Sequence, residues 1–398
     1  MSNPALDGVR VLDLTRILSG PYCTQILADH GAEVIKVERP GSGDDTRRFG
    51  PPFVGEDAAY FLSINRNKKS VCIDLKIPEG AELVRELARR SDVVVQNFRP
   101  GAAERLGLGP DDLRAVNPRL VYCSISGFGQ SGPWSDKPGY DLAVQGLSGV
   151  MSITGVPDGP PTKVGTSIAD IVTGMYAAQG ILLALYRRSQ TGVGDTVDIA
   201  MLDSMVSLLT YQAGNYFATG IAPGRAGNRH PNIVPYETFK ASDGWFNLAV
   251  GNDRLWARFC EVTGRDDLGG DARFTTNPDR VAHREALFGL LSQLFEPEPV
   301  SHWVALLEGA GIPCGPILDV AQVLAHPQVI AREMVTEARG QPLTGTPVKL
   351  KEAPSVAPRH PPRLGEHTAE VLAEVLGYDD ARVTSLAASG VIDTAHST

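Results

Sequence analysis

The sequence predicts an α/β fold built around a parallel β-sheet, together with a second, smaller domain. Two observations lead to this prediction. In the first 130 residues, short apolar runs typical of buried strands alternate with helical segments, which indicates βαβ units. The chain also has 398 residues, which is too long for one small core and suits two domains.

Five strands are expected before residue 130, with helical segments between them. Pro21 suits the first turn of a helix that ends at Asp29-His30-Gly31, and a further helix is expected over residues 78–90. The strands are apolar runs, several of them bounded by polar or turn residues. They are residues 9–15, 33–37, 71–75, 92–95 and 121–125.

The loops after these strands are the first place to look for a binding site, because open parallel sheets bind ligands beyond the carboxyl ends of their strands. The chain contains neither the dinucleotide fingerprint G-x-G-x-x-G in these loops nor the motif G-x-x-x-x-G-K-[ST] anywhere. The sequence therefore disfavours a plain dehydrogenase and a P-loop NTPase. The loops are residues 15–21, 38–43, 96–101 and 126–129.

One long helix is predicted over residues 167–188. Asp170 lies in its first turn and two arginines lie in its last turn, which suits the helix dipole, and Gly192 follows as a stop signal. Small residues such as Gly174 let another backbone pack closely, so we expect this helix to be buried. A short strand over residues 196–199 and a helix over residues 202–217 follow.

Two stretches rich in proline and glycine predict the domain boundaries. One is GIAPGRAGNRH at residues 220–230, and the other lies between residues 340 and 363. We expect a large domain over residues 1–219, a linker over 220–234, a small domain over 235–330, and a linker with a C-terminal segment over 331–398.

Composition excludes several classes of protein. The formal net charge of −9 argues against a nucleic-acid-binding protein, whose surface should be basic. No secretory signal is recognised, and the most apolar stretch, residues 181–185, is far shorter than the ~20 residues of a membrane span. Five scattered cysteines indicate reduced thiols rather than a zinc site. We expect a cytoplasmic protein with no metal and no membrane partner.

Asp170 has two interpretations. A carboxylate in the first turn of a helix is common and stabilising. The alternative is a nucleophile, because a carboxylate is already ionised at neutral pH and needs no general base to attack a thioester. Spacing alone favours the first interpretation.

Basic residues gather in the strand-end loops. Surface solvation explains most such residues, whereas phosphate binding is the alternative, because several lie just past a strand end. His230 stands alone in a loop, and no Ser/His/Asp order or G-x-S-x-G elbow supports a hydrolase. The basic loop residues are Arg16, Arg39, Lys76, Arg99 and Arg105.

Longer motifs run along nearly the whole chain. They are LDLTRILSGPYCTQILADHGAEVIKVERPGSGDDTR at 12–47, NRNKKSVCIDLK at 65–76, QNFRPGAAERLG at 96–107, SGFGQSGP at 126–133, GYDLAVQGLSG at 139–149, IPCGPI at 312–317 and LGEHT at 364–368. In this order they resemble the class III CoA-transferases, which include formyl-CoA transferase and carnitine CoA-transferase. The resemblance raises the nucleophile interpretation of Asp170 above the alternative.

The resemblance implies which residues act. The catalytic aspartate of the family is matched by Asp170, in a helix-opening segment that continues into Thr173-Gly174. Arginine and lysine among the matched positions would pair with the phosphates of CoA. The CoA-contacting positions of the family fall on Leu18, Ser19, Arg39, Lys76, Asn97, Phe98, Arg105 and Tyr140.

The resemblance also implies the architecture. Members of the family have a large Rossmann-like domain, completed by the chain's own C-terminal segment, and a smaller α/β domain. Two chains thread through each other as interlocked rings, so we expect a homodimer of this kind. The expected partners are acyl-CoA and carboxylic acid substrates, and no cofactor is expected beyond the CoA thioester itself.

The implied reaction moves CoA between carboxylic acids through a mixed anhydride and an aspartyl-CoA thioester on Asp170. A thioester is exchanged for a thioester, so neither ATP nor a metal is needed. Backbone N–H groups of a glycine-rich loop would stabilise the oxyanions. Gly251 is a candidate for this role by resemblance.

A dicarboxylate is the expected acceptor. The runs GDDTRRFGPPF at 43–53 and HPNIVPYETFK at 230–240 most resemble succinyl-CoA-dependent transferases that act on glutarate or hydroxymethylglutarate. Arg47, Arg48 or His230 would hold the second carboxylate, since arginine pairs bidentately with such a group.

Two alternatives remain at this point. An α-methylacyl-CoA racemase resembles this chain in fold, but it uses a His/Asp pair and places its histidine just before an Asp-Ile-Asn-Tyr run. Tyr140 stands at the equivalent position here, which favours transfer over racemisation. A non-catalytic CoA-binding protein is the second alternative, and the presence of Asp170 counts against it.

Overall fold

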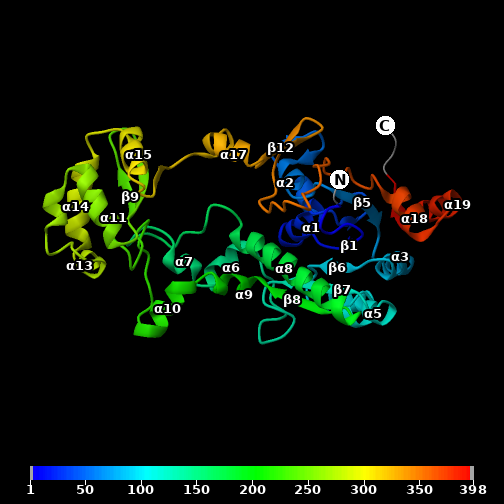
Figure 1. Ribbon diagram of the computed structural model, residues 1–398. Coiled ribbons are helices and arrows are strands. Elements are labelled where there is room, and N and C mark those ends of the chain that lie inside the picture. Colours follow the sequence, from blue (N-terminus) through cyan, green and yellow to red (C-terminus); the bar gives the residue numbers. More distant parts are fainter. Residues whose placement is uncertain (1–2, 395–398) are drawn as a thin grey trace. The chain divides into compact units, whose positions relative to one another are not determined.

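The computed structural model describes residues 3–394, and the chain divides into two compact units (Figure 1). Of the described residues, 3–150, 164–214 and 327–394 form the larger unit, and 151–163 and 215–326 form the smaller one. The predicted domain boundaries differ from these units. Residues 151–163 and 215–219 group with the smaller unit, and the return to the larger unit begins at Pro327 rather than at residue 331.

The larger unit is organised around a seven-stranded sheet of order β14-β5-β2-β1-β6-β7-β8. The six strands from β5 through β2, β1, β6 and β7 to β8 pair in parallel, and β14 pairs with β5 in the antiparallel sense. The C-terminal segment therefore completes the sheet. The strands are β1 (Arg10–Asp13), β2 (Glu33–Glu38), β5 (Lys68–Ile73), β6 (Val93–Gln96), β7 (Val121–Ser126), β8 (Thr196–Ala200) and β14 (Ile392–Asp393).

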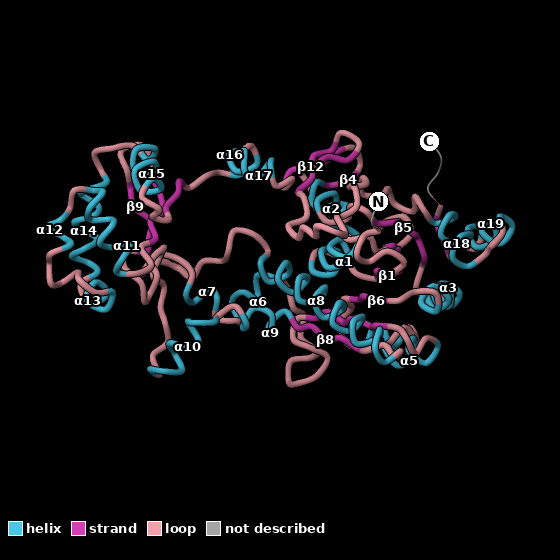
Figure 2. Tube along the Cα trace, viewed as in Figure 1, coloured by secondary structure: helices cyan, strands magenta, loops and turns pink. Residues whose placement is uncertain are grey.

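Helices cover both faces of this sheet (Figures 1 and 2). Alternate residues of β1 serve the two cores, so Val11 packs with α1 and α8 whereas Leu12 packs with α3 and α18. Burial on both faces explains why the strands are nearly continuous apolar runs. The covering helices are α1 (Ser19–Asp29) and α8 (Ile168–Thr191) on one face, and α3 (Pro78–Arg89), α5 (Pro110–Val116), α18 (Thr368–Leu376) and α19 (Asp380–Ala388) on the other.

Helix α8 packs against α1 through small residues on one face, as predicted, but its other face is exposed, so the expected burial holds for one face only. A Cβ added at Gly174 would lie 2.5 Å from the carbonyl oxygen of Ser19, so only glycine allows this approach. Gly192 ends the helix with a φ of 74°, as expected for a C-terminal glycine. In the described residues α8 is also the one helix long and apolar enough to cross a membrane, but 44% of its most apolar window is buried in the core.

Two sequence predictions of elements are wrong in detail. The helix predicted over residues 202–217 is two helices, α9 (Met201–Ser207) and α10 (Thr210–Thr219), and the break carries a positive φ of 34° at Thr210. Strand β5 begins at Lys68, three residues before the predicted start at residue 71. Its first two residues are lysines, of which Lys68 is buried and Lys69 half-buried, so hydropathy did not reveal them.

The smaller unit has a three-stranded antiparallel sheet of order β11-β10-β9 packed against helices. Its core is aromatic, with Phe239, Phe246, Phe259, Phe295 and Trp303 buried together. The elements are β9 (Tyr236–Lys240), β10 (Trp245–Ala249), α11 (Asp253–Thr263), α12 (Asp266–Gly269), α13 (Asn277–Ala282), α14 (Arg284–Phe295), α15 (Val300–Gly309), β11 (Cys314–Pro316) and α16 (Val320–Leu324).

The remaining elements are short connections (Figure 2). They are η1 (Asp45–Arg48), β3 (Phe53–Val54), β4 (Asp57–Ala58), α2 (Ala59–Ser63), α4 (Ala102–Arg105), α6 (Asp141–Leu147), α7 (Val150–Ile153), α17 (Pro327–Ala331), β12 (Val335–Ala338) and β13 (Gln341–Thr344). All five cysteines are free thiols, and four of them are buried.

Candidate active site

Two adjoining pockets open at the carboxyl ends of the parallel strands, within the larger unit. We call the first the strand-end pocket and the second the Asp170 pocket. Arg16 and Phe98 line both. The strand-end pocket, of about 250 Å³, is lined by Leu14, Thr15, Arg16, Lys36, Val37, Glu38, Arg39, Gly43, Asp44, Ile73, Asp74, Leu75, Lys76, Phe98 and Leu106.

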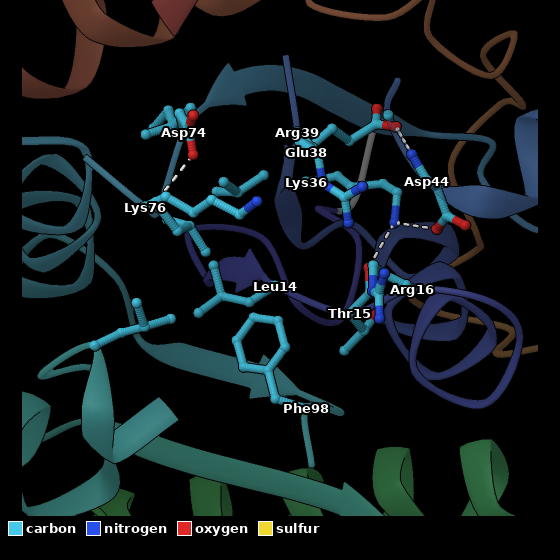
Figure 3. A pocket seen from close by; sticks show the side chains of 15 residues that line it. Leu14, Thr15, Arg16, Lys36, Glu38, Arg39, Asp44, Asp74, Lys76 and Phe98 are labelled. Carbon is cyan, nitrogen blue, oxygen red and sulfur yellow. Dashed lines mark hydrogen bonds and ion pairs between the residues drawn. The ribbon is translucent and has the colours of Figure 1, made fainter. Parts of the chain in front are cut away.

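The strand-end pocket combines an apolar wall with exposed positive charge (Figure 3). Leu14 and Phe98 form part of the wall, and the exposed side chains of Arg39 and Lys76 come from the ends of β2 and β5. Such an arrangement can hold a flat apolar group against the wall while the cations pair with phosphates. The structure thus brings together three of the predicted CoA-binding residues. Arg105 ends α4 beside the pocket-lining Leu106, and its side chain is exposed.

The Asp170 pocket, of about 160 Å³, is lined by Arg16, Ile17, Ser19, Asn97, Phe98, Arg99, Pro100, Ile125, Ser126, Gly127, Lys137, Pro138, Gly139, Tyr140, Asp170 and Met201. Four predicted residues, Ser19, Asn97, Phe98 and Tyr140, therefore lie around Asp170. Leu18 is buried and forms the N-cap of α1, directly before Ser19. Tyr140 is 69% exposed and stands at the mouth of the pocket.

The carboxylate of Asp170 lies between α1 and α6. Burial is the largest influence on it, and the negative charge of Asp141 adds to burial, so that its pKa is raised to about 6. The hydroxyl and the backbone N–H of Ser19 donate hydrogen bonds to the carboxylate and oppose this rise. At neutral pH the group is ionised yet poorly solvated, which is a favourable state for a nucleophile.

Asp141 also holds the start of α8. Its Oδ1 accepts a hydrogen bond from the backbone N–H of Ala169 at 2.9 Å, and its Oδ2 accepts one from Gln145 Nε2 at 2.7 Å. The carbonyl oxygen of the Gln145 side chain accepts in turn from the backbone N–H of Val164 at 2.9 Å. Asp141 therefore fixes the helix end that carries Asp170 and places a negative charge beside it.

We expect Asp141→Asn to move the acid limb of the pH–rate profile to lower pH. Loss of the neighbouring charge lowers the pKa of Asp170 from about 6, so more of it stays ionised at pH 5. The measurement is kcat/KM from pH 4.5 to 8. Gln145→Met is the matched control, because it removes a hydrogen bond from Asp141 without removing a charge. An equal shift in both variants would mean that the effect is structural rather than electrostatic.

Several predicted substrate residues lie elsewhere. Arg47 is 5% exposed, and its guanidinium is occupied by Glu38 at 2.7 and 2.8 Å and by Asp57 at 3.0 Å, so it is not available to a substrate carboxylate. Its proposed role is therefore corrected to a structural one. Arg48 is exposed and lines neither pocket. His230 and Gly251 belong to the smaller unit, and their roles stay predictions.

A cluster of buried charged side chains at the strand-end pocket was missed by the sequence analysis, and two of its members, Lys36 and Asp44, line that pocket. Lys68 pairs with Asp13 at 3.2 Å and Lys36 pairs with Asp44 at 2.9 Å, with all four side chains 0% exposed. These residues lie on or next to neighbouring parallel strands, and no short-range spacing links them. The sequence analysis also missed Lys137 and Asp141. Their only signal was the family-like motif GYDLAVQGLSG and the loop before it.

The described residues contain no group of three or more His, Cys, Asp or Glu side chains placed to hold a metal ion. The Asp170 pocket combines the partly buried carboxylate of Asp170 with hydrogen-bond donors and cations. The cations of the Asp170 pocket are Arg16, Arg99 and Lys137.

Comparisons with known proteins show the family of the chain. The model of CoA-transferase family III matches residues 6–368. The chain is 42% identical to the human succinyl-CoA:glutarate CoA-transferase over 98% of its own length and 90% of the relative's. It is 45% identical to the succinate–glutarate CoA-transferase of Agrobacterium fabrum, over 94% and 96% of the two chains. A CAIB/BAIF family protein from Brucella suis has a similar structure, with a TM-score of 0.85 and 45% identity over 94% of this chain and 100% of that one.

A parallel sheet with basic strand-end loops and a partly buried carboxylate can bind a phosphate-bearing substrate next to a reactive group. The chain belongs to CoA-transferase family III. It is therefore a transferase whose substrates include CoA thioesters.

Proposed function

We propose that the protein transfers CoA from succinyl-CoA to a dicarboxylate such as glutarate, with Asp170 as the covalent nucleophile. The observation that carries the proposal is the position of Asp170, ionised and partly buried at the meeting point of the loops after β1, β6 and β7. The relatives in human and in Agrobacterium fabrum, at 42% and 45% identity, support the choice of donor and acceptor.

The proposed reaction has four acyl transfers. A carboxylate oxygen of Asp170 attacks the thioester carbon of the donor, the C–S bond breaks, and CoA leaves as a thiolate. The thiolate attacks the aspartyl carbonyl of this anhydride and releases the donor acid. The acceptor carboxylate then attacks the aspartyl-CoA thioester and gives a second anhydride and free thiolate. The thiolate finally attacks the acceptor carbonyl, which frees Asp170 and completes the exchange.

The side chains of the Asp170 pocket support this sequence of steps. Both acids and CoA are anionic, and Arg16, Arg99 and Lys137 supply positive charge around the reacting carboxylate. Ser19 contributes an O–H and an N–H beside Asp170. These donors would also stabilise negative charge that develops on the aspartyl oxygens. In the smaller unit, His230 for the second carboxylate and Gly251 for an oxyanion remain part of the proposal.

The test of the proposed function is an exchange assay. Purified protein is incubated with succinyl-CoA and a pool of short mono- and dicarboxylic acids, and every acyl-CoA formed is identified by mass spectrometry. Glutaryl-CoA or another dicarboxyl-CoA is the expected product. Esters of monocarboxylic acids alone would remove the dicarboxylate from the proposal and leave the family assignment in place. No exchange with succinyl-, acetyl- or formyl-CoA would contradict the proposed function.

A homodimer in the cytoplasm completes the proposal. Helix α8 exposes a row of large apolar residues, including Leu183 at 63% and Tyr186 at 68% exposure, which a monomer would leave in water. Five free thiols are typical of a reducing compartment. Light scattering after gel filtration should give twice the 42.5 kDa chain mass, and a monomer would contradict the dimer.

A further inference from the structure

The turn between β1 and α1 is strained. It spans residues 14–18, and Ile17 within it has a φ of 71°, in the left-handed region. A β-branched residue rarely adopts this conformation, because its side chain crowds the backbone. Such an outlier persists only where surrounding contacts hold it, and these contacts often gather at functional sites. Ile17 itself lines the Asp170 pocket.

Two buried charged residues, Lys36 and Asp44, contact the turn (Figure 3). The backbone N–H of Ile17 donates to Asp44 Oδ1 at 3.2 Å. Lys36 Nζ lies 2.9 Å from Asp44 Oδ2 and donates to the carbonyl oxygen of Thr15 at 2.9 Å. The ion pair therefore makes hydrogen bonds to the backbone of Thr15 and Ile17, the residues before and after Arg16. Both side chains are 0% exposed, so these contacts are shielded from bulk water.

Other side chains fix the same turn. The Asn97 side chain accepts from the backbone N–H of Arg16 at 2.9 Å and donates to its carbonyl oxygen at 2.7 Å. The carboxylate of Asp13 accepts from the backbone N–H of Thr15 at 2.9 Å. Among these contacts, the hydrogen bond that Asp44 accepts is the one made by Ile17, the strained residue itself.

We infer that the Lys36–Asp44 pair is a positioning device that holds Ile17 in its left-handed conformation and thereby sets Ser19 against Asp170. Ser19 follows the strained residue by two positions and opens α1. The O–H and N–H of Ser19 lower the pKa of Asp170, whereas burial and the charge of Asp141 raise it. Tyr60 of α2 is a further neighbour of this carboxylate. The inference rests on the proposed function, in which ionised Asp170 is the nucleophile.

The test is a rescue experiment on the full-length enzyme. Asp44→Ala removes the acceptor of the Ile17 N–H, and Lys36 keeps Asp13 and Glu38 as neighbouring carboxylates. We expect kcat to fall by ~10²-fold, because Ser19 is displaced by about 1 Å from Asp170. The acid limb of the pH–rate profile should move to higher pH, because the hydrogen bonds from Ser19 that lower the pKa of Asp170 are lost. Adding Ile17→Gly removes the cost of the left-handed conformation. The double variant should have a kcat at least tenfold higher than Asp44→Ala, and its acid limb should lie again at the wild-type pH.

Controls separate this inference from stability and from the proposed function. Thr46→Val removes another hydrogen bond to Asp44 Oδ1 without touching the turn, and its acid limb should stay unchanged. If Asp44→Ala keeps the wild-type acid limb, or if Ile17→Gly raises the melting temperature without restoring kcat, the inference is wrong. If Asp44→Ala does not fold, Asp44→Asn is used, because its NH₂ group replaces one of the two acceptor oxygens, Oδ1 at Ile17 or Oδ2 at Lys36, and the same two outcomes decide. An active Asp170→Ala variant would instead overturn the proposed function.

Discussion

Asp170→Asn is expected to reduce CoA transfer by about 10⁴-fold, because removal of a covalent nucleophile leaves only binding and orientation to promote the reaction. An amide cannot form the anhydride, while its size and shape leave the packing of α8 against α1 intact. The measurement is the rate of glutaryl-CoA formation from succinyl-CoA. Asp170→Ala is assayed beside it, since deamidation of asparagine would regenerate aspartate.

A matched control is available on the neighbouring helix. Asp203 lies in the first turn of α9, as Asp170 lies in the first turn of α8, but it is exposed and outside the Asp170 pocket. Asp203→Asn should keep activity within twofold and cost about 0.3–1 kcal/mol of helix-dipole stabilisation. If the two variants lost activity equally, or if Asp170→Asn kept wild-type activity, the nucleophile assignment would fail.

Mass spectrometry of the protein gives a second measurement of the same prediction. Wild-type enzyme incubated with succinyl-CoA and digested rapidly should yield a peptide carrying Asp170 with bound CoA, since the aspartyl-CoA thioester is covalent. The Asp203→Asn variant should give the same peptide, and the Asp170→Asn variant should not. A CoA adduct on any other carboxylate would place the nucleophile elsewhere.

The closeness of the strand-end loops in space could be predicted from the sequence, because a parallel sheet places all of them at the same edge. Parallel strands joined by right-handed helical crossovers bring all their carboxyl ends to one edge, so the loops that carry Arg39, Asn97 and Phe98 had to meet. The register of β1 with β2 and β6 in the structure brings these loops together. Asp170 itself could not be told from an ordinary helix-end carboxylate by spacing, and the family resemblance was needed to single it out.

The buried charges could not be predicted, because a charged residue in a strand is normally a sign of exposure. Asp13, Lys36 and Lys68 are far apart in the sequence, and the pairing of β1, β2 and β5 brings them together. Asp44, the partner of Lys36, lies in the loop after β2. The same holds for Arg47, whose basic loop position looked suited to a substrate carboxylate until Glu38 and Asp57 were placed around it. Ion pairs that form only in the folded chain leave no pattern in the sequence next to the charged residue.

Lys68→Met is expected to lower the free energy of unfolding by about 3–5 kcal/mol, because it leaves a buried carboxylate without its partner. Lys68 Nζ contacts Asp13 Oδ2 at 3.2 Å, the carbonyl oxygen of Pro21 at 2.8 Å and Asn65 Oδ1 at 2.9 Å. Methionine fills the space but donates to none of these oxygens. Urea unfolding followed by circular dichroism measures the loss.

The adjacent lysine provides the control for this prediction. Lys69 pairs with Glu33, Glu370 and Glu374, whose side chains are 31%, 44% and 61% exposed. Because these partners can be solvated by water, Lys69→Met should cost no more than about 1 kcal/mol. Equal losses for the two variants would contradict the view that burial, rather than the number of ion pairs, decides the effect.

The pH dependence of this loss follows from Asp13. Burial by itself raises the pKa of Asp13, but Lys68 and Lys36 outweigh burial and hold the pKa at about 2, below its ordinary value of 3.8. A carboxylate whose pKa is lowered by folding stabilises the protein above its unfolded pKa and loses this contribution as the pH falls through the folded one. Burial lowers the pKa of Lys68 to about 8, so both partners are charged near neutral pH. The difference between wild type and Lys68→Met should therefore be largest near neutral pH and should shrink as the pH falls towards 2. A difference that stayed constant over this range would mean that lost packing, not the Asp13 charge, causes the instability.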